Sequence, residues 1–91
     1  MQKIVILDRD GVINFDSEAY VKSAEEWIPI PGSIEAIAQL KKAGFKVFIA
    51  TNQSGIGRGY YGLEELNAMH QKCSDLLAEY QVSLDGIYFC P

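Results

Sequence analysis

Ile4-Val5-Ile6-Leu7-Asp8-Arg9-Asp10-Gly11 is the stretch that decides the fold, because four apolar residues run directly into two carboxylates and a glycine. An apolar run without polar alternation is typical of a strand buried on both faces of a parallel sheet. In open α/β sheets, ligands bind beyond the carboxyl ends of the strands. The stretch therefore predicts a buried strand that carries Asp8 and Asp10 into a site.

The rest of the chain alternates between further strands and amphipathic helices. Apolar runs at 46–50 and 86–90 predict two more strands. A helix is expected from Pro31-Gly32-Ser33 to a stop at Gly44, and a second from Leu63 to about Tyr80, where apolar residues recur at spacings of three and four. Right-handed crossovers between parallel strands then predict an α/β fold, a Rossmann-like three-layer sandwich with a parallel sheet.

Composition indicates a single globular unit and argues against several classes of partner. The chain has 91 residues, of which 48% are hydrophobic and 22% charged, and its net charge is −4. An acidic chain without a basic cluster is a poor ligand for nucleic acid or an anionic membrane. No apolar stretch is long enough to span a bilayer, and the two cysteines form no CxxC pair. We expect a cytoplasmic protein in a reducing compartment.

The sequence stops at Cys90-Pro91, immediately after the third predicted strand. In native folds, a hydrophobic strand at the edge of a sheet is usually covered by another part of the protein. The expectation is that residues 1–91 are the N-terminal part of a single domain, truncated after this strand.

Asp8 and Asp10 are two residues apart and leave a strand together, so in extended backbone both side chains face the same side. Such a pair can divide the work of phosphoryl transfer, with one nucleophile and one general acid and base. Mg²⁺ would cancel the repulsion between the nucleophile and a phosphate dianion. Gly11 allows a sharp exit from the strand, and Arg9 is expected to point away from both acids.

A second polar cluster, Thr51-Asn52-Gln53-Ser54-Gly55-Ile56-Gly57-Arg58-Gly59, follows the second predicted strand. Its hydroxyl and amide groups and its glycine-exposed N–H groups suit a phosphoryl group. The same composition is common in flexible turns, but two neighbouring parallel strands would deliver both clusters to one crevice. The remaining candidates are given ordinary roles: Trp27 anchors a loop, Cys73 is a core thiol, and His70 has no assigned function.

The segments ILDRDGVIN and FIATNQSGIGRG resemble the first two motifs of the haloacid dehalogenase-like phosphohydrolase superfamily. Within it, DRDGVIN, IPIPG, TNQSGIGRGYY and DGIYFCP are similar to the heptose 1,7-bisphosphate 7-phosphatases, with the histidinol-phosphate phosphatases as close relatives. The resemblance implies a capless, Mg²⁺-dependent phosphatase that acts on a small sugar phosphate through an aspartyl-phosphate. It also implies a place in the synthesis of activated heptose for bacterial lipopolysaccharide.

Carried over residue by residue, the resemblance implies Asp8 as nucleophile, Asp10 as general acid and base, and Thr51 as a stabiliser of the transferred phosphoryl group. Asp8 and Asp10 would bind Mg²⁺. The implied substrate contacts are Asp16, Ser17, Glu18, Tyr20, Asn52, Gln53, Ser54 and, from the glycine loop, Arg58. Cys90 matches the first cysteine of a zinc loop and would hold structural Zn²⁺ only if the other ligands follow downstream.

The superfamily's lysine motif and its second acidic motif are expected beyond Pro91. Activity is therefore expected of the complete chain, as a monomer, and this piece alone is expected to be inactive. Two alternatives stay open: a histidinol-phosphate phosphatase, and a non-catalytic half-domain that serves as a binding or assembly module. In the second case the exposed strand edge would favour self-association.

Overall fold

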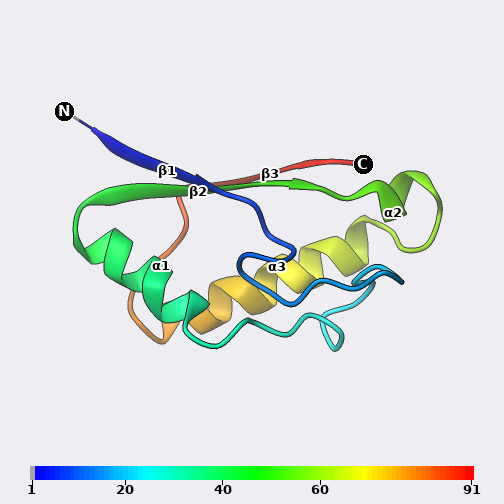
Figure 1. Cartoon of the computed structure of the whole chain (residues 1–91), viewed down its shortest axis with the longest axis horizontal. Helices are drawn as coiled ribbons and strands as arrows, with labels where there is room; N and C mark the ends of the chain where they lie inside the picture. Colours follow the sequence, from blue (N-terminus) through cyan, green and yellow to red (C-terminus); the bar gives the residue numbers. More distant parts are fainter. Residues whose placement is uncertain (1) are drawn as a thin grey trace.

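The computed structural model describes residues 2–91 as a parallel sheet with helices packed beneath it (Figure 1). The elements follow in the order β1 (Lys3–Leu7), α1 (Ser33–Lys42), β2 (Phe45–Asn52), α2 (Ser54–Gly57), α3 (Leu63–Ala78) and β3 (Gly86–Cys90). The predicted α/β class is confirmed, and each predicted strand and helix forms. None of the helices described is long and apolar enough to cross a membrane.

The sheet has the order β1-β2-β3, with β2 parallel to both neighbours. Leu7 lies opposite Ile49, and Asn52 lies opposite Cys90. Because β2 extends beyond the end of β1, Asp8 leaves the sheet beside the last residues of β2. The register therefore brings the two polar clusters of the sequence to the same edge.

Helices α1 and α3 both lie on one face of the sheet (Figure 1). That face supplies the buried strand residues Val47 and Ile49, which pack in one hydrophobic cluster with residues of both helices. Buried members of the cluster outside the sheet include Trp27, Ile37, Leu66, Met69, Cys73 and Leu77. Burial of this apolar surface is the main favourable term for the fold.

The opposite face of the sheet is open in the part of the chain that the structure describes. Ile4, Ile6 and Tyr88 are 54%, 68% and 63% exposed. The prediction that the apolar run of β1 is buried on both faces is therefore wrong for Ile4 and Ile6. Their side chains alternate with those of Val5 and Leu7, and α1 and α3 cover only the second set.

The helix ends match the expected signals. Gly44 has a φ of 93° just after α1, a left-handed conformation that glycine adopts without strain. At the start of α3, the Glu65 carboxylate accepts a hydrogen bond of 2.9 Å from the Gly62 N–H. Trp27 is fully buried, which confirms it as a loop anchor, and Lys72 of α3 donates to the carbonyls of Ala24 and Trp27 at 2.7 and 2.6 Å.

Helix α2 was not expected, because Ser54–Gly57 reads as a glycine loop. Its single turn is closed by hydrogen bonds from the Arg58 and Tyr60 N–H groups to the Ser54 and Gly55 carbonyls, at 3.0 and 2.8 Å. Gly55 is buried against the ring of Tyr61, with no room for a Cβ. Tertiary packing by Tyr61 thus stabilises a turn that glycine alone disfavours.

Candidate active site

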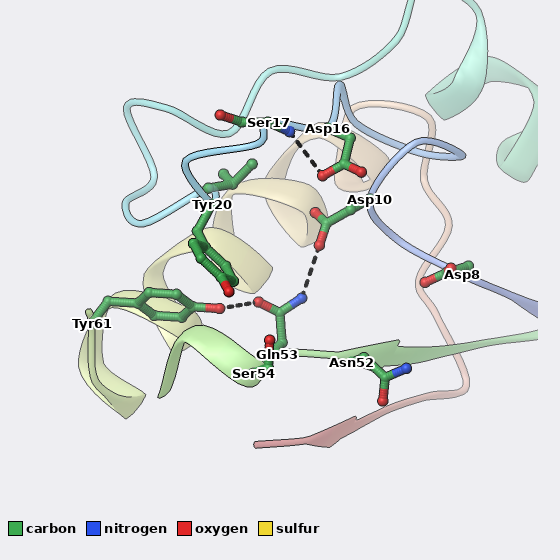
Figure 2. Close-up of a pocket in the computed structure, with 10 residues that line it drawn as sticks. Asp8, Asp10, Asp16, Ser17, Tyr20, Asn52, Gln53, Ser54 and Tyr61 are labelled. Atoms are coloured by element: carbon green, nitrogen blue, oxygen red, sulfur yellow. Dashed lines mark hydrogen bonds between the residues drawn. The ribbon is translucent and has the colours of Figure 1, made fainter. Parts of the chain in front are cut away.

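A cavity of about 240 Å³ opens where β1 and β2 end (Figure 2). Its lining comes from three places in the chain: the turn after β1, the loop at 16–21, and the segment that joins β2 to α3. The lining residues are Asp8, Asp10, Asp16, Ser17, Tyr20, Val21, Asn52, Gln53, Ser54 and Tyr61. Both predicted acids therefore reach one cavity.

Asp8 is the exposed member of the acid pair. Its Oδ1 accepts a hydrogen bond of 2.8 Å from the Arg9 backbone N–H. Asp8 also borders a second hollow of about 380 Å³ over β2 and β3, which it shares with Thr51, Asn52 and Cys90. An accessible carboxylate with little competing hydrogen bonding is suited to nucleophilic attack.

Asp10 is half-buried and held by hydrogen bonds on both oxygens. Its Oδ1 accepts from Arg9 Nε at 3.0 Å, Arg9 Nη2 at 2.8 Å and Asn14 Nδ2 at 2.8 Å. Its Oδ2 accepts from Gln53 Nε2 at 3.1 Å. The two acids thus lie in different surroundings, as a nucleophile and a general acid require.

Arg9 is 1% exposed and forms an ion pair with Asp10, so the prediction that it points away from both acids is wrong. Extended backbone does not continue past β1. The N–H groups of Val12, Ile13 and Asn14 all point at the Arg9 carbonyl, at 3.2, 2.8 and 3.3 Å. This turn, which includes Gly11 at a φ of 84°, curls the chain and brings the Arg9 guanidinium and the Asp10 carboxylate together.

The Arg9 guanidinium also reaches α3 and β2. Its Nη1 lies 3.7 Å from Met69 Sδ and 3.4 Å from His70 Nε2, and its Nη2 donates to Gln53 Oε1 at 3.2 Å. Burial and, to a lesser degree, the Arg9 charge lower the pKa of His70 to about 4. His70 is therefore neutral near pH 7 and can accept a hydrogen bond from Arg9.

Gln53 joins the two polar clusters of the sequence. The side chain is 2% exposed, and its Nε2 donates to Thr51 Oγ1 at 2.9 Å as well as to Asp10. Its Oε1 accepts from the Tyr61 hydroxyl (Figure 2). The same oxygen also accepts from Arg9 Nη2. Burial raises the pKa of Tyr61, so this hydroxyl keeps its proton as a donor.

The structure brings most of the predicted site residues together. Asp16, Ser17, Tyr20, Asn52 and Ser54 line the cavity with the two acids. Three of the predicted catalytic and substrate-contact residues lie elsewhere. Thr51 is buried and borders the second hollow, Glu18 lines a neighbouring hollow that includes Tyr20 and Tyr60, and Arg58 is exposed at the end of α2.

From the sequence, His70 has no site role and Tyr61 could either line the substrate entrance or anchor the loop. In the structure, Tyr61 lines the cavity and bonds to Gln53. His70 follows Met69 on α3, and nothing in the helical periodicity marks it as a neighbour of Arg9. The contact between Arg9 and His70 joins residues 61 positions apart, so no local signal could have identified it. The contact between Tyr61 and Gln53 depends on how the turn of α2 folds between them.

Mg²⁺ suits the donor set at the acid pair. Mg²⁺ is commonly held by one or two carboxylates, with water and substrate phosphate completing its shell. Asp8 and Asp10 line the same cavity, and Asp8 is accessible. Within residues 2–91, no group of three or more His, Cys, Asp or Glu side chains is arranged to hold a metal ion. Cys90 is an exposed free thiol without companion zinc ligands in this range.

The sheet presents an accessible carboxylate, Asp8, and a second, hydrogen-bonded carboxylate, Asp10, at its carboxyl edge. A solved putative HAD-like phosphatase of Mesorhizobium loti superposes on the chain with a TM-score of 0.84 at 38% identity, covering 99% of this chain and 42% of that one. The family described as polynucleotide kinase 3 phosphatase matches residues 3–90, and the chain belongs to this family. The resemblance seen in the two sequence motifs is thereby confirmed.

Close relatives are known by sequence and by structure. The chain is 61% identical over 89 residues to a D-glycero-beta-D-manno-heptose-1,7-bisphosphate 7-phosphatase of Pseudomonas putida, covering 98% of this chain and 51% of that protein. A Pseudomonas aeruginosa protein of the same name is 57% identical, with 99% and 51% covered. The chain spans about half the length of these relatives.

A solved D,D-heptose 1,7-bisphosphate phosphatase of Bordetella bronchiseptica, complexed with magnesium and phosphate, superposes with a TM-score of 0.96 at 51% identity. The match covers 99% of this chain and 50% of that one. The corresponding phosphatase of Burkholderia thailandensis gives a TM-score of 0.75 at 49% identity, with 99% and 54% covered.

Proposed function

We propose that residues 1–91 are the N-terminal part of a single phosphatase domain that hydrolyses D-glycero-D-manno-heptose 1,7-bisphosphate to the 1-phosphate with Mg²⁺. The observation that carries the proposal is the pair of acids in one cavity, Asp8 accessible and Asp10 held on both oxygens. The heptose substrate is taken from the names of the relatives, at identities up to 61%.

In this mechanism, an Asp8 carboxylate oxygen attacks the phosphorus and the bond from phosphorus to the sugar oxygen breaks. Asp10 gives its proton to the leaving sugar oxygen. Water then attacks the aspartyl-phosphate, Asp10 takes up a proton from that water, and inorganic phosphate and the free Asp8 carboxylate are released. The different surroundings of the two carboxylates favour this assignment.

Bound Mg²⁺ would neutralise phosphate charge as Asp8 approaches. Asp8, through its carboxylate, and Asp10, through its backbone carbonyl, are the residues proposed to hold it. Thr51 is proposed to stabilise the transferred phosphoryl group from the side of the second hollow that Asp8 also borders.

Substrate contacts are proposed for the polar residues around the cavity. Asn52 and Ser54 face it from the end of β2, and Asp16, Ser17 and Tyr20 face it from the loop that follows the acid pair. Glu18 and Arg58 lie outside the cavity lining, and we assign them to the outer part of a sugar bisphosphate. Gln53 lies at the cavity wall with its amide engaged by protein groups.

The remaining half of the protein is proposed to complete the site. The lysine and second acidic motif that the family resemblance implies would come from there, as would the partners of Cys90 in a structural zinc loop. The complete protein is proposed to act as a cytoplasmic monomer in lipopolysaccharide heptose metabolism. Reading the coding sequence beyond the Pro91 codon tests whether these motifs follow.

The activity is tested on the protein encoded by the full reading frame. Phosphate release is measured with heptose 1,7-bisphosphate, histidinol phosphate and a 3′-phosphorylated oligonucleotide, each with Mg²⁺ and with EDTA. We expect Mg²⁺-dependent release that favours the heptose bisphosphate and is abolished in Asp8→Asn. A preference for histidinol phosphate or for the oligonucleotide would replace the proposed substrate. Turnover in EDTA would contradict the proposed requirement for Mg²⁺.

A further inference from the structure

We propose that Arg9 and Gln53 are positioning residues that hold the Asp10 carboxylate in one orientation, with Oδ2 as the oxygen that exchanges a proton with substrate and water. The inference rests on the proposed function, since it assigns an oxygen to the acid and base step. It concerns residues whose side chains are buried behind the reacting groups.

Oδ1 of Asp10 has no free position for a proton. A carboxylate oxygen offers two lone pairs, and this one already receives three N–H donors, two from Arg9 and one from Asn14. The Arg9 donors are charged, and charge-assisted hydrogen bonds are about twice as strong as neutral ones. Protonating Oδ1 would place a hydrogen against this set of donors.

Oδ2 receives a single donor, Gln53 Nε2 at 3.1 Å. One lone-pair position therefore stays free to carry the exchanged proton. The orientation of the Gln53 amide is determined by its other partners. Arg9 Nη2 and the Tyr61 hydroxyl both donate to Oε1, so turning the amide over would set donors against donors and a carbonyl against the carboxylate.

Arg9 is held from behind by α3. Met69 Sδ and His70 Nε2 flank Nη1, and the guanidinium is 1% exposed. A neutral His70 ring acts as an acceptor for this N–H. No residue of α3 lines the cavity. The helix nevertheless helps to orient Asp10, because its contacts hold Arg9 and Arg9 holds the carboxylate.

The proton therefore follows a single route in this proposal. As Asp8 forms its bond to phosphorus and the bond to the sugar oxygen breaks, the Oδ2 proton moves to that oxygen. In the second step the attacking water forms a bond to phosphorus, the bond to Asp8 breaks, and a water proton returns to Oδ2. Arg9 and Gln53 exchange no protons. Arg9 bonds Asp10 through Oδ1 alone, and the Gln53 amide donates a hydrogen bond that positions Oδ2.

The test uses the complete protein in single-turnover experiments with two leaving groups. A sugar alkoxide needs a proton to leave, whereas 4-nitrophenolate leaves readily without one. Arg9→Lys keeps the charge but loses the fork that grips Oδ1. We expect Arg9→Lys to slow the release of heptose 1-phosphate from heptose 1,7-bisphosphate by at least about tenfold. The rate of 4-nitrophenolate release from 4-nitrophenyl phosphate should change little.

Gln53→Met removes the donor to Oδ2 at similar volume and should show the same selective loss. Lys42→Met removes an exposed lysine of α1 and serves as the matched control, with both leaving groups unaffected. Equal losses for both leaving groups in Arg9→Lys and Gln53→Met would mean a merely structural role and would overturn the inference. If the unaltered complete protein releases neither leaving group, the proposed function fails instead.

Discussion

Gly55 and Tyr61 show how tightly the site is packed at the scale of single residues. A Cβ on Gly55 would collide with the Tyr61 ring, whose hydroxyl orients Gln53. We predict that Gly55→Ala lowers the free energy of unfolding by about 1–3 kcal/mol, because the ring cannot move without breaking that bond. Urea denaturation of the complete protein measures this change.

Gly57→Ala is the matched control for that substitution. It lies in the same helical turn, and its Cβ would meet only the Pro91 backbone at 3.6 Å, an ordinary van der Waals distance. Equal stability losses in the two variants would show that glycine flexibility, rather than the contact with Tyr61, governs the effect.

The two cysteines differ in their expected reactivity. Burial raises the pKa of the Cys73 thiol to about 11, whereas Cys90 is exposed at the end of β3. At about pH 8, only about one Cys73 thiol in a thousand is the reactive thiolate. We predict that iodoacetamide labels Cys90 and spares Cys73 in the folded 91-residue chain prepared alone, as mass spectrometry of the peptides will show. Labelling of Cys73 at the Cys90 rate would contradict its place in the core, and both should react in denaturant.

At the scale of elements, the packing of α3 against the turn after β1 makes stability depend on pH. The pKa of His70 is lowered to about 4 in the folded chain, chiefly by burial and then by the Arg9 charge, while Asp10 opposes the shift. The unfolded chain therefore takes up this proton first. Stability is retained above about pH 6.5 and is lost as the pH falls towards 4.

We predict that the loss between these pH values amounts to at most about 3 kcal/mol. His70→Gln keeps an acceptor for Arg9 but does not titrate, so its free energy of unfolding should fall less steeply over the same range. Urea denaturation of both proteins at several pH values provides the comparison. Parallel curves would show that acid sensitivity comes from other groups.

For the whole molecule, the main feature is the sheet face that the described residues leave uncovered. Ile4 and Ile6 of β1 and Tyr88 of β3 are exposed there on either side of β2, whose Phe48 ring lies 6.3 Å from the Tyr88 ring. Contiguous exposed apolar side chains mark a surface that binds another surface. We predict that the 91-residue chain, prepared alone, associates with itself as its concentration rises, and that Ile6→Thr with Tyr88→Thr weakens this association.

Sedimentation velocity over a range of concentrations measures the association. The control is Lys42→Thr, which alters an exposed residue away from this face and should leave association unchanged. Ile13→Thr would not be suitable, because Ile13 is buried in the core. A monomer at every concentration would contradict the prediction. The complete protein should not associate in this way if its remaining half covers the face.

The sequence by itself determined the order of strands and helices and the edge of the sheet where Asp8, Asp10 and the Thr51–Gly59 cluster meet. Those features follow from local patterns: apolar runs, helical spacing, capping signals, and the rule that parallel strands end at one edge. The contacts of Arg9, Gln53, Tyr61 and His70 were decided only by the tertiary structure. They join residues up to 61 positions apart, and the turn that buries Arg9 depends on packing against α3, which no local pattern encodes.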